Sequence, residues 1–403
     1  MDELRELSCV ADIQDFLGNL PEDLKMAYDK IMDRVKNRKG ASPKIAYRAF
    51  LWVMGCSRPL TDVELVAAVC QDPATEATNT VNITAKFIPG ACNNLLTIDQ
   101  SGVWRFSHLS VREYLETHHY RHAEAHTLIG TVCLRLLSDP TNKDRLDSIA
   151  SEVEDTNGLL EYAVLHWTAH VRRHANPITD DCLQSLLKRF LGLPNEHSPA
   201  HVAWCSAYGA LKSYTGPQLG ERAIVSVLYF GLTGALDGWT SGLDVNWTTG
   251  DGCPLLHVAV QGKDGGNLEV ARKLLELGHD VNAQGGLYGN ALQAASERSG
   301  NGAMVRLLLD HGADVNAQGG EYGTALHAAA TKFGNEATIG LLLDRGADIN
   351  SQGVGDCTAL QDAAAIGNEA IVRLLLDRKA DVNARGAVYG SALQAASQPA
   401  KWQ

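Results

Sequence analysis

The sequence predicts a mainly α-helical protein that ends in a solenoid of repeated helix pairs. Two observations support this fold class. A short motif returns at a nearly constant interval in the C-terminal part, and the preceding part is dominated by amphipathic stretches with helical spacing. A chain of 403 residues has room for more than one hydrophobic core. We therefore expect separate helical segments in front of the solenoid.

The repeat is marked by the motif Asp-Val-Asn or Asp-Ile-Asn. The motif begins at Asp244, Asp280, Asp314, Asp348 and Asp381, at intervals of 33 to 36 residues. A leucine in a following alanine-rich segment keeps the same step, at Leu256, Leu292, Leu326, Leu360 and Leu393. Such self-similarity is typical of a solenoid, where each repeat buries its apolar face against its neighbours. Because Asp310 has counterparts at Asp344 and Asp377, we interpret it as framework and not as a metal-holding carboxylate.

Each repeat carries residues that begin and end two helices. An N-cap residue followed three positions later by glutamine predicts a capping box at the first helix, at Asn290–Gln293, Thr358–Gln361 and Ser391–Gln394. The second helix has Leu, Ile and Val at helical spacing and ends at Gly278, Gly312 or Gly346, whereas Lys379 replaces this glycine in a later repeat. The segment "ADVNAQGG" has the turn chemistry of a projecting hairpin loop, which we name the finger.

This helix–turn–helix–finger pattern resembles the ankyrin repeat. The resemblance covers about residues 252–403 and is nearly complete in "GTALHAAATKFGNEATIGLLLDRGADINSQ" (323–352). It implies a binding scaffold without catalytic residues or cofactors, whose protein partner meets the fingers and the concave face of the first helices. The partner-binding positions it implies are Leu287, Tyr288, Glu321, Tyr322, Asp356, Val388 and Tyr389. For the tyrosines a second interpretation stays open, in which each ring packs against the next finger.

The outer repeats depart from the pattern. Residues 226–246 are interpreted as a shortened, degenerate first repeat, and "CPLLHVAV" (253–260) has no hydroxyl N-cap. The last repeat stops after one helix at Gln403, so we expect it to be truncated.

Three helices followed by a β-hairpin are expected in the front part. One helix is "LPEDLKMAYDKIMDRV" (20–35), and two more lie in "KIAYRAFLWVMGCSRPLTDVELVAAV" (44–69), the second starting at a Thr61–Glu64 capping box. "NLLTID" and "VWRFSHL" have strand composition and are joined by the turn "QSG". This order resembles a winged helix.

The order of "LPEDLKMAYDKIM", "RPLTDVEL", "FSHLSVREYL" and "YAVLHWTAH" is similar to the region after the NACHT module in fungal STAND (NLR-like) proteins. The resemblance implies a winged-helix domain at 20–120, a helical linker at 121–223 and ankyrin repeats at 224–403. It also implies that residues 1–19 are the tail of a nucleotide-binding module missing from this chain. The chain would then be the sensor or regulatory part of a signalling receptor.

No motif predicts catalysis or a bound cofactor. The phosphate loop G-x-x-x-x-G-K-[ST] does not occur, because Gly262–Lys263 lacks the earlier glycine and the hydroxyl residue. A G-x-S-x-G nucleophile motif is also missing from the sequence. His118, His122 and His126 share one helical face, but a structural zinc site needs four converging ligands, so we expect no metal. The chain is predicted not to be an enzyme.

Charge and composition favour a protein partner in the cytoplasm, with the nucleus as an alternative location. The net charge is −12, and residues 224–403 hold 12 Lys and Arg against 19 Asp and Glu, which favours a neutral or basic partner. The apolar stretch at 223–236 is too short to cross a membrane. The locally basic segment 30–48 leaves a competing hypothesis, a nucleic-acid-binding regulator that uses the winged helix.

Overall fold

The computed structural model describes residues 22–72, 83–151, 158–173, 181–194, 198–212, 219–220, 222–237, 239, 242–263, 265–298, 300–330 and 336–397. Within these ranges the chain is mainly α-helical with one two-stranded sheet, as predicted. It divides into an N-terminal unit (Met1–Gly192 with Ser198–Tyr214) and a C-terminal unit (Leu193–His197 with Thr215–Gln403). The expectations for residues 1–19 and for the end of the last repeat (398–403) lie outside the described residues.

The N-terminal unit begins with the expected helices and hairpin. Its first elements are α2 (Glu22–Lys36), α3 (Ser42–Gly55), α4 (Asp62–Cys70), α5 (Phe87–Ala91), β1 (Leu96–Ile98), β2 (Trp104–Phe106) and α6 (Leu109–His118). The strands pair antiparallel, and the capping box at Thr61 and Glu64 is present. The five-residue helix α5 was not predicted, since its sequence FIPGA contains a proline and a glycine, which disfavour helices.

Six further helical segments complete the N-terminal unit. They are α7 (His122–Ser138), the 3-10 helix η2 (Pro140–Asn142), α8 (Lys143–Ala150), α9 (Leu159–Arg173), α10 (Asp181–Leu191) and α11 (Pro199–Lys212). Helix α7 packs against α9, α10 and α3, so the segments expected as winged helix and linker share one core. Edge-to-face contacts of Trp167 with Phe190 and with Trp204 lie within it. The division at residue 120 stays a prediction.

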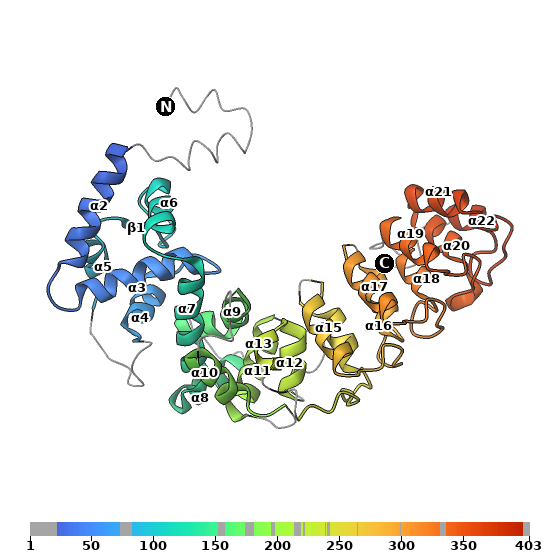
Figure 1. Ribbon diagram of the computed structural model, residues 1–403, viewed down its shortest axis with the longest axis horizontal. Coiled ribbons are helices and arrows are strands. Elements are labelled where there is room, and N and C mark those ends of the chain that lie inside the picture. The colour runs from blue at the N-terminus through green and yellow to red at the C-terminus, as the bar shows by residue number, and fades with distance from the viewer. Residues whose placement is uncertain are drawn as a thin grey trace. The chain divides into compact units, whose positions relative to one another are not determined.

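The C-terminal unit consists of successive helix pairs (Figure 1). The first helix of each pair is α12 (Ala223–Phe230), α14 (Leu255–Gln261), α16 (Ala291–Glu297), α18 (Ala325–Ala329) and α20 (Ala359–Ile366). The second is α13 (Thr233–Asp237), α15 (Leu268–Glu276), α17 (Gly302–Asp310), α19 (Glu336–Asp344) and α21 (Glu369–Asp377). Helix α22 (Ala392–Ala396) follows, and a 3-10 turn η3 (Val354–Asp356) lies in one finger. The first helices pack on one another from α12 to α22, and the second helices from α13 to α21.

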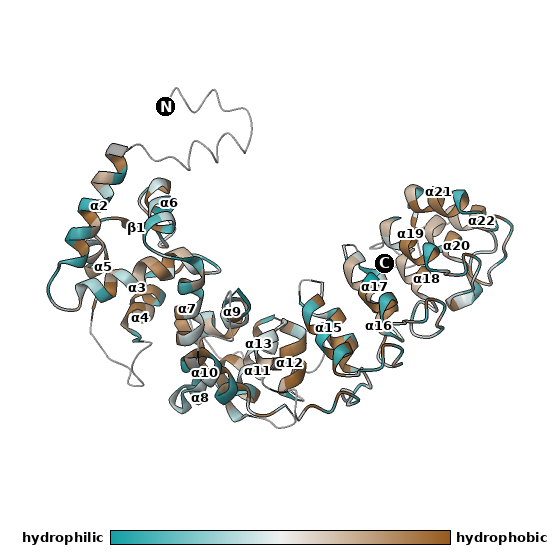
Figure 2. Cartoon of the chain, in the orientation of Figure 1, coloured by the Kyte–Doolittle hydropathy of each residue, from teal (hydrophilic) through white to brown (hydrophobic). Residues whose placement is uncertain are grey.

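The burial of these helices follows their composition. Figure 2 colours α12 as hydrophobic along its length, and nearly all of its residues are buried. Helix α15 carries hydrophilic as well as hydrophobic residues, and only the apolar face with Val270, Ala271 and Leu274 is buried. The pair α12–α13 packs on α14 and α15, which fits the expected degenerate first repeat.

Most helix ends match the expectations from the sequence. The capping boxes at Asn290 and Ser391 are formed, and the helix that follows Pro254 has no side-chain cap. At Thr358 only half of the expected box is present: Gln361 accepts from the Thr358 N–H at 2.7 Å, while the buried Thr358 hydroxyl has no hydrogen-bond partner among the described residues. The left-handed backbone after the second helix is also present, with φ of about 90° at the three glycines Gly278, Gly312 and Gly346. Lys379 has φ +69° at the same position, a conformation that costs a residue with a side chain roughly 1 kcal/mol.

Candidate interaction surface

The fingers are short loops closed by one backbone bridge each. Four fingers, which we number from first to fourth, span residues 285–289, 319–323, 352–358 and 386–390, and each is closed by a bridge between its ends. A bridge between Thr248 and Pro254 closes the corresponding loop before α14. Neighbouring fingers are also joined, because the Glu321 N–H donates to the Leu287 carbonyl at 3.0 Å. Gly320 has φ +62°, and a Cβ there would lie 2.1 Å from the Tyr288 carbonyl oxygen. Glycine therefore permits the first two fingers to stack closely.

One polar residue in each of α16, α18 and α20 holds the following finger. The Gln293 side-chain nitrogen donates to the carbonyls of Gly319 (3.2 Å) and Gly323 (2.7 Å). Gln361 donates in the same way to Gly390 at 2.7 Å, and in an intervening repeat His327 Nε2 donates to the Cys357 carbonyl at 2.9 Å. The predicted capping role is confirmed for the glutamines. The brace to the next repeat was missed, because a capping pattern describes contacts only within one repeat.

The turns between repeats are linked by a second repeated contact. Asn282 accepts from the Asp314 N–H at 2.8 Å and donates to the Gly312 carbonyl at 3.2 Å. Asn316 makes the same two bonds one repeat later. Asp310 pairs with Arg345 of the next repeat at 2.8 Å, and Asp344 pairs with Arg378 at 2.9 Å. The Asp310 carboxylate thus holds an arginine, as its counterpart does.

Most of the partner-binding positions proposed from the sequence lie at the surface of the fingers. Leu287 is 64% exposed and Val388 is 44% exposed, while Glu321 and Asp356 are also exposed. Their backbones are fixed by the bridges described above. Exposed apolar side chains on a rigid backbone are suited to binding a partner.

Tyr288 and Tyr322 are half-buried and lie against each other. Their rings stack with centroids 6.1 Å apart and an interplanar angle of 16°. The Tyr322 hydroxyl donates to Glu297 Oε1 at 3.0 Å. Burial, followed by the charge of Glu297, raises the pKa of both hydroxyls above the ordinary tyrosine value. Packing between neighbouring fingers, one of the two interpretations of these tyrosines, is thus present, and part of each ring still faces solvent.

A profile described as "Ankyrin repeats (3 copies)" matches residues 234–319, 256–353 and 292–386. The C-terminal region is made of ankyrin repeats. No curated protein matches the chain. The match agrees with the helix pairs, braces and fingers described above, and it begins inside α13, in the repeat interpreted as degenerate.

The last ankyrin finger differs from the first two. Tyr389 is only 5% exposed and belongs to a hydrophobic cluster with Cys357, Ala364, Ala365 and Ala395. Its ring therefore stabilises the last repeats and offers almost no surface to a partner, contrary to the position expected for it. Val354, which the sequence analysis did not single out, is 58% exposed on the neighbouring finger. The signal for it was available, since valine stands there where the first two fingers have a second glycine.

The three histidines expected on one helical face lie on two helices, because His118 ends α6 while His122 and His126 belong to α7. The described residues contain no group of three or more potential metal-binding side chains. His126 is buried and its Nδ1 lies 3.0 Å from Nδ1 of His170, so the two imidazoles share a hydrogen bond. His122 lies 3.3 Å from Glu116. No helix in the described ranges is both long and apolar enough to cross a membrane.

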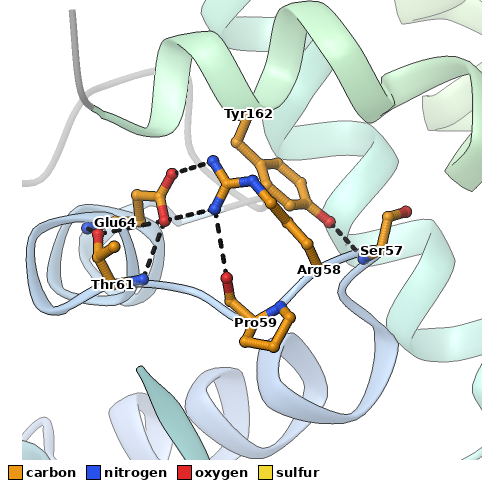
Figure 3. Close-up of polar contacts among 6 residues, drawn as sticks. All are labelled: Ser57, Arg58, Pro59, Thr61, Glu64 and Tyr162. Carbon is orange, nitrogen blue, oxygen red and sulfur yellow. Dashed lines mark hydrogen bonds and ion pairs between the residues drawn. The ribbon is translucent and has the colours of Figure 1, made fainter. Parts of the chain in front are cut away.

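A partly buried polar network fixes the turn between α3 and α4 in the N-terminal unit (Figure 3). Arg58 donates to both Glu64 oxygens, at 2.9 and 2.5 Å, and its guanidinium lies 5.5 Å from the Tyr162 ring centroid. The Tyr162 hydroxyl accepts from the Ser57 N–H at 2.8 Å and bonds His170 Nε2 at 2.8 Å. Burial lowers the pKa of His170 to about 3, so this imidazole is neutral at pH 7. We interpret the network as a structural link between the turn and α9.

The basic segment 30–48 is partly occupied by contacts within the chain. Arg38 donates to the Gly90 carbonyl and to Asn93, and the Lys36 amine lies 3.5 Å from His119 Nδ1. These side chains hold α2 and the following loop to other parts of the N-terminal unit. They favour the interpretation of this segment as a structural connection.

Proposed function

We propose that the protein binds a protein partner through its ankyrin fingers and the neighbouring ends of its first helices. The observation that carries this proposal is the exposure of Leu287, Val354 and Val388 on three of the fingers. Apolar side chains on a surface whose backbone is already ordered lose little conformational entropy when a partner covers them. The side chains of His257, His327 and Gln361 supply this order, because they donate to the carbonyls of Gly289, Cys357 and Gly390 in the three fingers.

The charge of the repeats supports a neutral or basic partner. Residues 224–403 hold 12 Lys and Arg against 19 Asp and Glu, and Glu321 and Asp356 are exposed on the fingers beside the apolar residues. Complementary charge raises the association rate and disfavours acidic partners.

We further propose that the N-terminal unit is a winged-helix-type regulator in an NLR-like receptor of fungal STAND type. The order of α2, α3 and α4 followed by the β1–β2 hairpin supports this, together with the order of the sequence motifs. In this proposal the unit relays binding to a nucleotide-binding NACHT module that is supplied elsewhere, in the cytoplasm. The chain itself binds and does not catalyse. Nucleotide hydrolysis by the purified chain above the buffer background would contradict that part.

Capture from a lysate of the source organism tests the binding proposal. The full chain is compared with a variant that carries Leu287→Asp, Val354→Asp and Val388→Asp. A control variant carries Leu376→Asp and Val382→Asp, at two exposed apolar positions outside the fingers. We expect the native chain and the control to retain the same partners and the finger variant to lose them. Equal capture by all three proteins would contradict the proposed surface.

A further inference from the structure

The stacked tyrosines of the first two fingers form a surface with a specific charge. Tyr288 and Tyr322 come from neighbouring fingers, and Glu297 lies beside them at the last residue of α16. Glu321, next to Tyr322 in the chain, is exposed on the same finger. We name these four residues the tyrosine–glutamate face.

The charges around this face are mainly negative. Glu297 and Glu321 both contribute to raising the pKa of the two tyrosine hydroxyls, after the larger effect of burial. Arg298 acts in the opposite sense on Tyr288, but its guanidinium lies 3.4 Å from the Gln261 and Gly262 carbonyls of the preceding repeat. Among the described residues, no lysine or arginine forms an ion pair with Glu297 or Glu321.

We propose that the tyrosine–glutamate face binds an arginine side chain of a basic segment in the partner. A guanidinium is planar and can lie over a tyrosine ring while it donates hydrogen bonds to the Glu297 carboxylate. A lysine amine is a point charge without this planar surface, so it gains less from a stacked pair of rings. Leu287, which is 64% exposed beside Tyr288, gives an apolar residue next to the arginine a place to pack. This inference rests on the proposed function and names the chemistry of the partner.

The later fingers lack the combination that makes this face. Asp356 stands in the third finger where the first two have tyrosine, and Tyr389 of the fourth finger is buried. The third finger also has a different backbone, since it spans residues 352–358 and contains the 3-10 turn η3. The inferred arginine site therefore belongs to the first finger pair.

Fluorescence anisotropy of the full chain with a labelled peptide of alternating arginine and glycine tests the inference. Peptides with lysine, and with the neutral isostere citrulline, replace arginine as comparisons. We expect the arginine peptide to bind more tightly than the lysine peptide and the citrulline peptide to bind least. Glu297→Gln should weaken binding of the arginine peptide about tenfold, and the double variant Tyr288→Leu with Tyr322→Leu about fivefold.

Asp377→Asn is the matched control, since it removes one negative charge at an exposed position at the end of α21. It should change the affinity less than twofold. Equal weakening by Glu297→Gln and Asp377→Asn, or equal binding of arginine and citrulline peptides, would overturn the inference. If the tyrosine double variant does not fold, the comparison of Glu297→Gln with the control still decides it. Loss of the arginine preference while lysate capture still needs the fingers would reject this inference and keep the proposed function.

Discussion

The ankyrin region and the N-terminal unit both bury polar side chains, but they do so differently. In the ankyrin region the same bond occurs once per repeat, as with Gln293 and Gln361, which reach the next finger from equivalent positions. In the N-terminal unit the contacts of Arg58, Glu64 and Tyr162 occur once (Figure 3). A repeated contact leaves a repeated pattern in the sequence, whereas a contact made once leaves no such trace.

The largest expected effect is a loss of stability when the repeated leucine is replaced in an inner repeat instead of in the last repeat. Leu326 is 1% exposed and Leu393 is 82% exposed at the equivalent position. Leu326→Ala should therefore lower the free energy of unfolding by about 2–5 kcal/mol. Leu393→Ala should lower it by less than about 0.5 kcal/mol, since a surface substitution removes little buried area. Denaturant unfolding of the ankyrin region measures both. Similar losses of unfolding free energy for the two variants would show that burial of Leu326 between neighbouring repeats does not stabilise the region.

Acid should weaken the N-terminal unit through His170. Burial, with a smaller effect from His126, lowers the pKa of His170 from 6.5 to about 3 in the folded chain. The unfolded chain therefore binds the proton first, and stability falls as the pH drops from about 6.5 toward 3, by up to about 1.4 kcal/mol per pH unit. Hydrogen exchange of the α9 amides as a function of pH measures this. Protection that stays constant over that range would contradict the prediction.

The ankyrin region allows a milder version of the same test. Burial lowers the pKa of His257 to about 4, while glutamine occupies the equivalent position in two other repeats, at Gln293 and Gln361. His257→Gln should therefore reduce the acid sensitivity of this repeat and change its stability little at pH 7. Exchange of the α14 amides at pH 7 and pH 5 checks both parts. A variant as acid-sensitive as the native chain would rule out His257 as the source.

Two ion pairs sharpen the comparison, because the carboxylate of Glu64 is buried (4% exposed) and that of Asp310 is not (53% exposed). Burial alone would raise the pKa of Glu64, but the bonds from Arg58 and Thr61 outweigh it and the pKa is lowered. A double-mutant cycle with Arg58→Met and Glu64→Gln should give a coupling of about 1.5–3 kcal/mol. The exposed pair of Asp310 and Arg345 should give less than about 1 kcal/mol. A larger coupling free energy for Asp310 and Arg345 than for Arg58 and Glu64 would contradict the expected order of the two ion pairs.

The smallest expected effect concerns the helix end at Lys379. Its φ of +69° is the left-handed conformation that glycine adopts at the equivalent position Gly346. Lys379→Gly should therefore stabilise the last repeats, by about 0.5–1 kcal/mol, because the strain of the side chain is removed. The thermal midpoint of the ankyrin region measures it. Destabilisation by this change would show that a contact of the lysine side chain stabilises the fold by more than the backbone strain costs.

The sequence was sufficient to predict the repeats, but it was not sufficient to predict contacts that occur only once in the chain. The period, the capping boxes at Asn290 and Ser391 and the left-handed Lys379 follow from local chemistry seen several times in the chain. The burial of Tyr389 could not be predicted, because its motif is shared with the partly exposed Tyr322 and only the surrounding packing differs. The exposure of Val354 was visible as a departure from glycine and was overlooked.

The same limit applies to the N-terminal unit. The helices, the hairpin and the Thr61 capping box follow from hydrophobic spacing and turn residues. The bond between His126 and His170 joins residues 44 positions apart, and no local pattern predicts such a pair. Sequence reasoning thus placed the elements and left their buried polar contacts to be found in the structure.

Hydrogen exchange of the full chain, with and without the partner that the intact fingers capture, tests the central claim most directly. We predict slower exchange on binding in residues 285–289, 319–323, 352–358 and 386–390, which form the four numbered fingers. The amides of the N-terminal helices α2 and α3 should show no direct protection of similar size. Protection confined to the N-terminal unit, with the fingers unchanged, would contradict the claim that the ankyrin fingers are the binding surface.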